Sequence, residues 1–201
     1  MRSLLFLCVL LSLTSCGSEE APEIIPEKTF CDFVECLNGG VCIDNACLCE
    51  KGYAGIDCAF QKKPKLIKLK SVILHKFPDV DETGNPWDDD IEELFPAFQD
   101  EKLPELYFSI SNPLEVLYKK TANIFDANPG NDYEMKMLDM IEFDQIDLEH
   151  KIGLLDFDKN GSQLIDQVSF YPYEDDNGFP DTLSVSNNLI DFSLVIEYIF
   201  E

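Results

Sequence analysis

Six cysteines crowd the segment from Cys31 to Cys58, and they constrain the fold of this chain more than any other feature. The segment reads CDFVECLNGGVCIDNACLCEKGYAGIDC. So short a piece cannot bury enough apolar surface to fold alone, so covalent cross-links have to stabilise it. An even set of cysteines in such a segment is typical of a disulfide framework in an exported protein. Their spacing alone leaves many pairings open.

The first residues indicate that the chain is exported. Arg2 precedes the apolar run from Leu4 to Leu13, which has the layout of a secretion signal and is too short to span a bilayer. The run ends in Leu13-Thr14-Ser15-Cys16, which resembles the lipobox of bacterial lipoproteins. That resemblance implies a signal peptide of residues 1–15, lipid on Cys16 and attachment to the membrane, because each buried CH₂ of an acyl chain contributes about 0.8 kcal/mol. The alternative is an ordinary cleaved signal with an incidental cysteine.

Residues 16–30 form a predicted tether. After Cys16 the sequence reads GSEEAPEIIPEKTF, in which prolines and glutamates occur without a hydrophobic period, so we expect an extended spacer. Glu19 and Glu20 resemble signals that send some Gram-negative lipoproteins to the outer face of the outer membrane. The predicted location is therefore the bacterial outer membrane, with the protein exposed at the cell surface.

The cysteine segment, residues 31–58, resembles the epidermal-growth-factor-like (EGF-like) module. The resemblance rests on the spacing C-x4-C-x5-C-x4-C-x-C-x8-C, on Gly39-Gly40 and on the run from Gly52 to Gly55. It implies two small hairpins and the disulfides Cys31–Cys42, Cys36–Cys47 and Cys49–Cys58. Metal binding by these thiols is the competing hypothesis, and an oxidising compartment argues against it. The sequence PEKTF before Cys31 lacks the acidic motif of the calcium-binding subtype, so no calcium is expected here.

Composition excludes some functions. The chain has 201 residues, 45% of them hydrophobic, and a formal net charge of −24, so it can bury a core despite its acidity. Arg2 is its only arginine, and a polyanion would be repelled, so no nucleic-acid partner is expected. His75 and His150 have no nucleophile motif beside them. We expect both on the surface of the folded protein rather than in a catalytic site.

The region from Lys65 to Glu201 predicts an antiparallel β-sandwich. Several segments are rich in β-branched and aromatic residues and are separated by Asn, Asp, Gly and Pro. In the last one, Phe192, Leu194 and Ile196 alternate with polar residues, as expected of a half-buried strand. The residues after Trp87 could add a helical turn within a long loop. The expected strands lie in KLIKLKSVIL, ELYFSIS, EVLYKKTANIF, HKIGLLDFD, QVSFYPY, DTLSV and LIDFSLVIEYIF.

The order of strands and acidic loops in this region resembles the C2 domain, the synaptotagmin-type calcium-binding sandwich. In that family, carboxylates from a first and a third loop meet at one end of the sandwich. The segment LLDFDKNGSQLID would supply the third loop, and FPDVDETGNPWDDD the first. Calcium is therefore the expected cofactor. The resemblance implies as ligands Asp81, Glu105, Asp156, Asp158 and Asp166.

Two alternatives for the segment at Asp156 stay open. Asp156, Asp158, Asn160 and Gly161 also fit the first half of an EF-hand loop, but Gln167 stands where a bidentate glutamate belongs. A solvated turn is the other alternative, because Asp, Asn and Gly favour turns without any metal.

These features together predict a non-catalytic lipoprotein. Its EGF-like module would act as a spacer, and its sandwich would bind an extracellular protein, a glycan or a lipid headgroup, with calcium ordering the loops. Adhesion is one function of this kind. The alternative is a calcium-independent structural component of an outer-membrane complex. Paired acids such as Asp88 and Asp89 could serve glycoside hydrolysis, but adjacent carboxylates on a polar turn are usually solvated, so no enzyme is expected.

Overall fold

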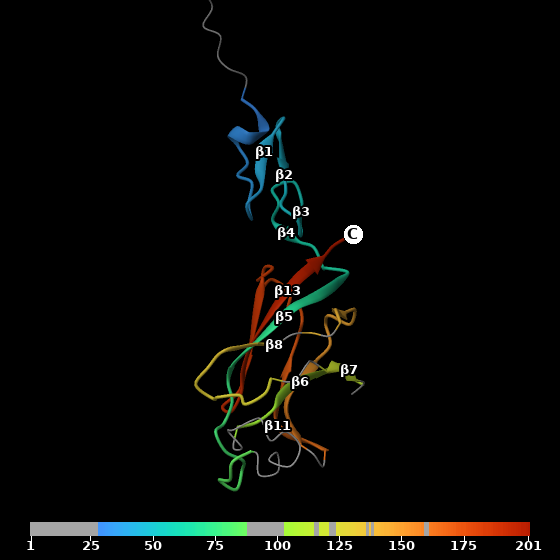
Figure 1. Ribbon diagram of the computed structural model, residues 1–201. Helices are drawn as coiled ribbons and strands as arrows, with labels where there is room; N and C mark the ends of the chain where they lie inside the picture. Colours follow the sequence, from blue (N-terminus) through green and yellow to red (C-terminus); the bar gives the residue numbers. More distant parts are fainter. Residues whose placement is uncertain are drawn as a thin grey trace, which may run out of the picture.

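The computed structural model describes residues 28–87, 103–114, 117–120, 124–135, 137, 139–158 and 161–201. Four expectations lie wholly or mostly outside these residues: the signal sequence, the lipid on Cys16, the tether of residues 16–30 and the helical turn after Trp87. Within the described ranges, no helix is long and apolar enough to cross a membrane. Figure 1 shows a small module joined end to end with a larger body of strands.

The small module is held by disulfides rather than by a core. Its bonds join Cys31 to Cys42, Cys36 to Cys47 and Cys49 to Cys58, the pairing that the EGF-like resemblance implies. Apolar side chains such as Phe33 and Leu48 stay exposed. Its elements are η1 (Phe30–Asp32), the hairpin of β1 (Val41–Ile43) and β2 (Ala46–Leu48), and the hairpin of β3 (Tyr53–Ala54) and β4 (Phe60–Gln61).

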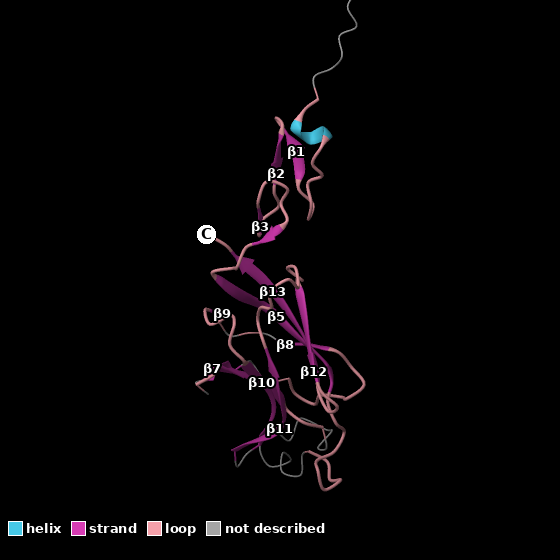
Figure 2. Cartoon of the chain, turned by 180° about the vertical axis from the view of Figure 1, so that it is seen from behind, coloured by secondary structure: helices cyan, strands magenta, loops and turns pink. Residues whose placement is uncertain are grey.

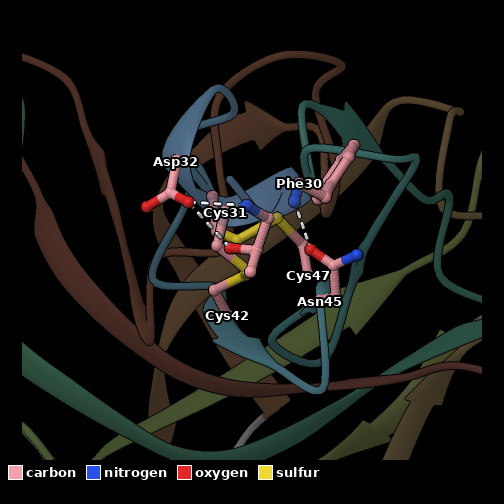
Figure 3. The surroundings of a disulfide bond; sticks show 8 residues. Phe30, Cys31, Asp32, Cys42, Asn45 and Cys47 are labelled. Carbon is pink, nitrogen blue, oxygen red and sulfur yellow. Dashed lines mark hydrogen bonds between the residues drawn. A yellow bond between two sulfur atoms is a disulfide. The ribbon is translucent and has the colours of Figure 1, made fainter. Parts of the chain in front are cut away.

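Local hydrogen bonds fix the start of this module around its first disulfide (Figure 3). The backbone N–H of Thr29 donates to the Asp32 carboxylate at 2.6 Å, and the N–H of Phe30 donates to the side-chain oxygen of Asn45. Asp44 and Asn45 join β1 to β2 with φ values of 50° and 65°. Two positive φ values in a two-residue hairpin loop are typical of a type I′ turn, for which Asn and Asp are suited.

Two antiparallel sheets form the body that follows (Figure 2). One has the order β11-β10-β6-β7; the other has the order β12-β13-β5-β8, with β9 also paired to β5. The predicted fold class is therefore confirmed: a mostly β chain in which a disulfide-stapled module precedes an antiparallel β-sandwich. The strands are β5 (Leu66–Lys76), β6 (Leu106–Ser111), β7 (Leu117–Lys120), β8 (Tyr133–Met135), β9 (Ile141–Phe143), β10 (His150–Asp158), β11 (Gly161–Phe170), β12 (Thr182–Ser186) and β13 (Asp191–Ile199).

The core lies between the two sheets, as the alternation of side chains predicts. On β13, Phe192, Leu194 and Ile196 are buried and their neighbours are half-buried. The facing sheet contributes Phe108 and Ile152, both fully buried. Burial of each such side chain contributes about 1.5–3 kcal/mol relative to exposure, so the sandwich is stabilised mainly here.

A bulge in β5 explains an irregularity in its pattern. Leu69 pairs with Ile196 and Ser71 with Val195, which leaves Lys70 as an extra residue without an opposite partner in this register. The buried face accordingly shifts from Leu69 to Val72. One inserted residue reverses the in–out alternation of a strand, so both halves of β5 face the core.

His150 corrects one expectation. It was predicted on the surface, but it is fully buried, opposite Phe170 on β11 and with its ring centroid 5.1 Å from that of Phe143. Its ring Nδ1 lies 2.8 Å from the Leu148 carbonyl oxygen. The prediction was wrong because His150 is the first residue of a core-facing alternation that continues at Ile152 and Leu154. Burial lowers the pKa of His150, which favours the neutral ring.

Candidate functional site

Two of the five predicted calcium ligands lie together. Glu105, just before β6, and Asp156, on β10, are both buried. The Asp156 carboxylate accepts a hydrogen bond from the Glu105 backbone N–H at 2.8 Å, and the Glu105 carbonyl accepts one from the N–H of Phe157 at 2.9 Å. These two hydrogen bonds join the residue before β6 to the end of β10, so Asp156 has a structural role here whatever else it binds.

Asp81 and Asp166 are each engaged locally. The Asp81 carboxylate accepts from the backbone N–H groups of Asn85 and Thr83, both at 2.8 Å, and closes its own turn. The Asn85 N–H and the Thr83 hydroxyl hold the pKa of Asp81 below its ordinary value. Asp166 accepts from the side chain of Asn187 at 2.9 Å, which ties β11 to the end of β12.

The segment expected to form the third loop continues two strands instead. β10 runs through Asp158, and β11 begins at Gly161. Asp156 pairs with Gln163 and Asp158 with Gly161 in the antiparallel ladder. The predicted strand HKIGLLDFD is confirmed as β10, whereas the expected third loop does not extend beyond Gly161, where β11 begins; residues 159 and 160 lie outside the described residues.

Four of the five predicted calcium ligands are described with their side chains, and the side chain of the fifth, Asp158, lies outside the description. In the ranges that the structure covers, no three side chains of His, Cys, Asp or Glu are grouped so that they could hold a metal ion. Among the four described ligands, Asp81 and Asp166 accept hydrogen bonds from neighbouring residues, and Glu105 and Asp156 lie together. Calcium binding at these residues stays a prediction.

An aromatic cluster joins the EGF-like module to the sandwich. Phe179, from the connection between β11 and β12, lies edge-on to three other rings. The ring centroids of Tyr53, Tyr198 and Phe200 are 5.2, 5.1 and 5.0 Å from that of Phe179. Edge-to-face pairs at this spacing contribute about 0.5–1.5 kcal/mol each beyond burial. Tyr53 belongs to β3, so this cluster joins the two parts of the chain.

Gln61 of β4 adds polar bonds to the same connection. Its side-chain NH₂ donates to the Tyr173 hydroxyl at 3.1 Å and to the Gly178 carbonyl at 3.2 Å. Its side-chain oxygen accepts from the backbone N–H of Gly178 at 3.1 Å. One amide thus pairs both backbone groups of Gly178, as a neighbouring strand would. Lys63 further pairs with Asp147 across the junction.

Gly52 allows this close approach. Its φ is +95°, and an added Cβ would collide with Phe179 and lie 2.8 Å from the Phe200 ring. Glycine is thus required both for the backbone conformation and for the space. Its backbone carbonyl also accepts from the N–H of Lys62 at 2.7 Å. The turn before β3 therefore lets the rings of Phe179 and Phe200 pack directly against its backbone.

A groove opens beside this junction, between the edge strands of the two sheets. It has a volume of about 420 Å³. β11 contributes Ser169 and Phe170, and β12 contributes Thr182 and Ser184. The connection from β11 to β12 adds Tyr171, Pro172, Glu174, Asn177, Gly178 and Pro180, and the remaining lining residues are Leu183, Val185 and Tyr198.

The groove combines aromatic surface with hydrogen-bonding groups. The Tyr171 side chain is 48% exposed, whereas Tyr198 is buried at the floor. Burial, with smaller effects of Tyr173 and Asp181, raises the pKa of Tyr198 to about 12, so its hydroxyl stays protonated. Among the described residues of the lining, Glu174 is the one charged side chain. Cavities of this size with a few polar groups are typical of ligand sites.

Sequence reasoning did not find this groove or the junction. Gln61 lies between the predicted module of residues 31–58 and the predicted sandwich, and Phe179 lies between the predicted strands QVSFYPY and DTLSV. A phenylalanine in an otherwise polar turn, EDDNGFPD, was the available signal, because an apolar ring there needs a partner.

Comparison with known proteins gives little information about the function of this chain. No protein-family model matches the chain, and no curated protein matches it. One solved chain, described as "Structure of a C2 domain", is similar in fold with a TM-score of 0.39 and 8% identity. The alignment covers 65% of this chain and 95% of that one.

Proposed function

We propose that this chain is an exported, lipid-anchored and non-catalytic binding protein. The β-sandwich takes a ligand in the groove between β11 and β12. The EGF-like module carries the sandwich away from the membrane and holds it in a fixed orientation. Cys16 provides the anchor, and residues 16–30 provide the tether at the surface of the outer membrane.

One observation carries the proposal: the connection from β11 to β12 belongs to both the groove and the junction. Gly178 lines the groove, and its backbone is bonded to Gln61 of the EGF-like module. Tyr198 lines the groove and packs against Phe179. A mere spacer has no need to contact the wall of a groove. This arrangement favours a binding role over a purely structural component of a complex.

Calcium has no part in this proposal. The groove lies among Ser169, Thr182 and Ser184, whereas the predicted calcium ligands Glu105 and Asp156 lie where β10 meets the start of β6. The binding surface suggested by the resemblance and the one described here are therefore different. Ligand binding that requires calcium would indicate the predicted calcium-binding end of the sandwich. Ligand binding that is unchanged by a chelator would indicate the groove.

A matched pair of substitutions tests the groove. Ser184→Trp adds a large ring in the groove, whereas Ser186→Trp adds the same ring on the same strand outside the lining. Both serines are exposed, so both variants should fold. The full chain is applied to an array of immobilised glycans, peptides and lipid headgroups. We expect a bound class that Ser184→Trp loses and Ser186→Trp keeps; equal binding by both variants, or no bound class, would contradict the proposal.

A further inference from the structure

We infer that the ligand of the groove is a neutral saccharide. This inference rests on the proposed function and names the class of ligand that the groove accepts. The argument uses the shape of the groove, the chemistry of its lining and its charge. Each of these excludes a different kind of occupant.

The groove is bordered by the connection from β11 to β12. β11 ends at Phe170, β12 begins at Thr182, and the connection between them lines the groove through Glu174, Asn177 and Gly178. Gly178 is held in place by Gln61. An extended peptide added to the edge of β12 would run into this wall. A compact ligand such as one or two sugar rings meets no such limit.

The lining offers both kinds of surface that a sugar presents. A pyranose ring has an apolar face of C–H groups and a rim of hydroxyls that donate and accept hydrogen bonds. Tyr171 supplies a half-exposed aromatic ring, and its flat surface can receive the apolar face. Ser169, Thr182 and Ser184 supply hydroxyls on the two edge strands, and Asn177 supplies an amide. Because hydroxyls both donate and accept, they suit a ligand rich in hydroxyls.

Charge excludes anionic ligands. Glu174 lines the groove, Asp175 and Asp176 follow it, and Asp181 precedes β12. A phosphate, a sulfated sugar or a sialic acid would meet these carboxylates within a chain of net charge −24. A neutral saccharide avoids this repulsion, and the Glu174 carboxylate can accept hydrogen bonds from two adjacent hydroxyls. An apolar ligand would leave Glu174 and the hydroxyls desolvated without partners.

Calorimetric titration of the full chain, with Cys16 replaced by alanine to prevent lipidation, tests the inference. The probes are neutral oligomers of glucose, mannose, galactose and N-acetylglucosamine, with sulfated and sialylated oligomers as charged controls. We expect at least one neutral oligomer to bind and the charged ones not to bind. Tyr171→Ala should weaken binding by about tenfold, the loss expected for one aromatic contact, and Tyr171→Phe should keep most of it.

The same titration separates failure of this inference from failure of the proposed function. Ser184→Trp should abolish binding and Ser186→Trp should leave it unchanged. A charged oligomer that binds and is lost only in Ser184→Trp would leave the groove as the binding site but overturn the neutral saccharide. Binding of no oligomer would overturn the saccharide alone, since the array of peptides and lipid headgroups still tests the groove. Saccharide binding unaffected by Ser184→Trp would overturn both. Circular dichroism of each variant excludes unfolding as the cause.

Discussion

The ring of Phe179 in the β-sandwich lies edge-on to that of Tyr53 in the EGF-like module, with 5.2 Å between the centroids. This pair joins two segments that are far apart in the sequence and that sequence analysis assigned to separate domains. Around it, Gln61 binds Gly178 and Gly52 leaves room for the Phe179 ring. The small module therefore contacts the wall of the groove directly.

Gly52→Ala should destabilise the chain and loosen the junction. The added methyl meets Phe179, and alanine disfavours the φ of +95°. Gly84 is a matched control, because its φ is +86° but nothing lies within 4 Å of an added Cβ. Unfolding in denaturant should show a cost of about 1 kcal/mol for Gly84→Ala and a larger one for Gly52→Ala. Equal costs would mean that Phe179 does not restrict the side chain at residue 52.

The burial of His150 predicts a pH dependence of stability. Burial lowers its pKa, so in mildly acidic solution the unfolded state binds a proton that the folded state does not. The free energy of unfolding should therefore fall as the pH drops below about 6.5, the ordinary pKa of histidine. Thermal melts between pH 7.5 and pH 5.5 measure this, and His150→Phe should flatten the dependence while His75→Gln, as control, should not. If the pH dependence of stability persists in His150→Phe, other titratable groups cause it.

The lipid anchor has a direct chemical test. Labelled fatty acid fed to bacteria that express the full chain should enter the wild-type protein and be absent from Cys16→Ala. Cys8→Ala is the control, because residue 8 would leave with the signal peptide. Label that persists in Cys16→Ala would remove the anchor from the proposal.

Substitution of Asp81 distinguishes a role in closing its turn from a role in metal binding. Its carboxylate accepts hydrogen bonds from Thr83 and Asn85, and the side-chain oxygen of Asn can accept the same bonds. Asp81→Asn should therefore change the melting temperature little, and by the same amount in chelator, in calcium and in magnesium. A calcium-specific rise in the wild type that Asp81→Asn abolishes would show that Asp81 is a ligand after all.

The sequence predicted the sheets well where alternation was strong. Leu194 and Ile196 of β13 are buried as the pattern indicated, because a period of two fits a strand with one buried face. The short strands β8 and β9 were missed, since three residues such as Tyr133–Met135 carry too little periodic signal. The expected third loop was too long, because β11 already begins at Gly161 although Gly161 and Ser162 have little β propensity.

The candidate groove could not be predicted from sequence, for a physical reason. It exists only because β11 and β12 are the edges of different sheets, and which strands become edges depends on pairings distant in sequence. The contact between Gln61 and Gly178 has the same origin. A glutamine in a connector carries no local signal of its partner. By contrast, the EGF-like module was readable because its cysteine spacing is local.

Amide hydrogen exchange at Gly178 tests the central relationship most directly, namely that the EGF-like module holds the wall of the groove. The Gly178 N–H donates to the Gln61 side chain at 3.1 Å, so NMR of the full chain reads this bond without any ligand. Gln61→Ala should speed exchange at Gly178 by about tenfold, since one such hydrogen bond contributes about 0.5–1.5 kcal/mol. Gln163→Ala, an exposed site on β11, should leave the exchange of Gly178 unchanged. Exchange at Gly178 that is equally slow in Gln61→Ala and in the wild type would contradict the coupling of the module to the groove.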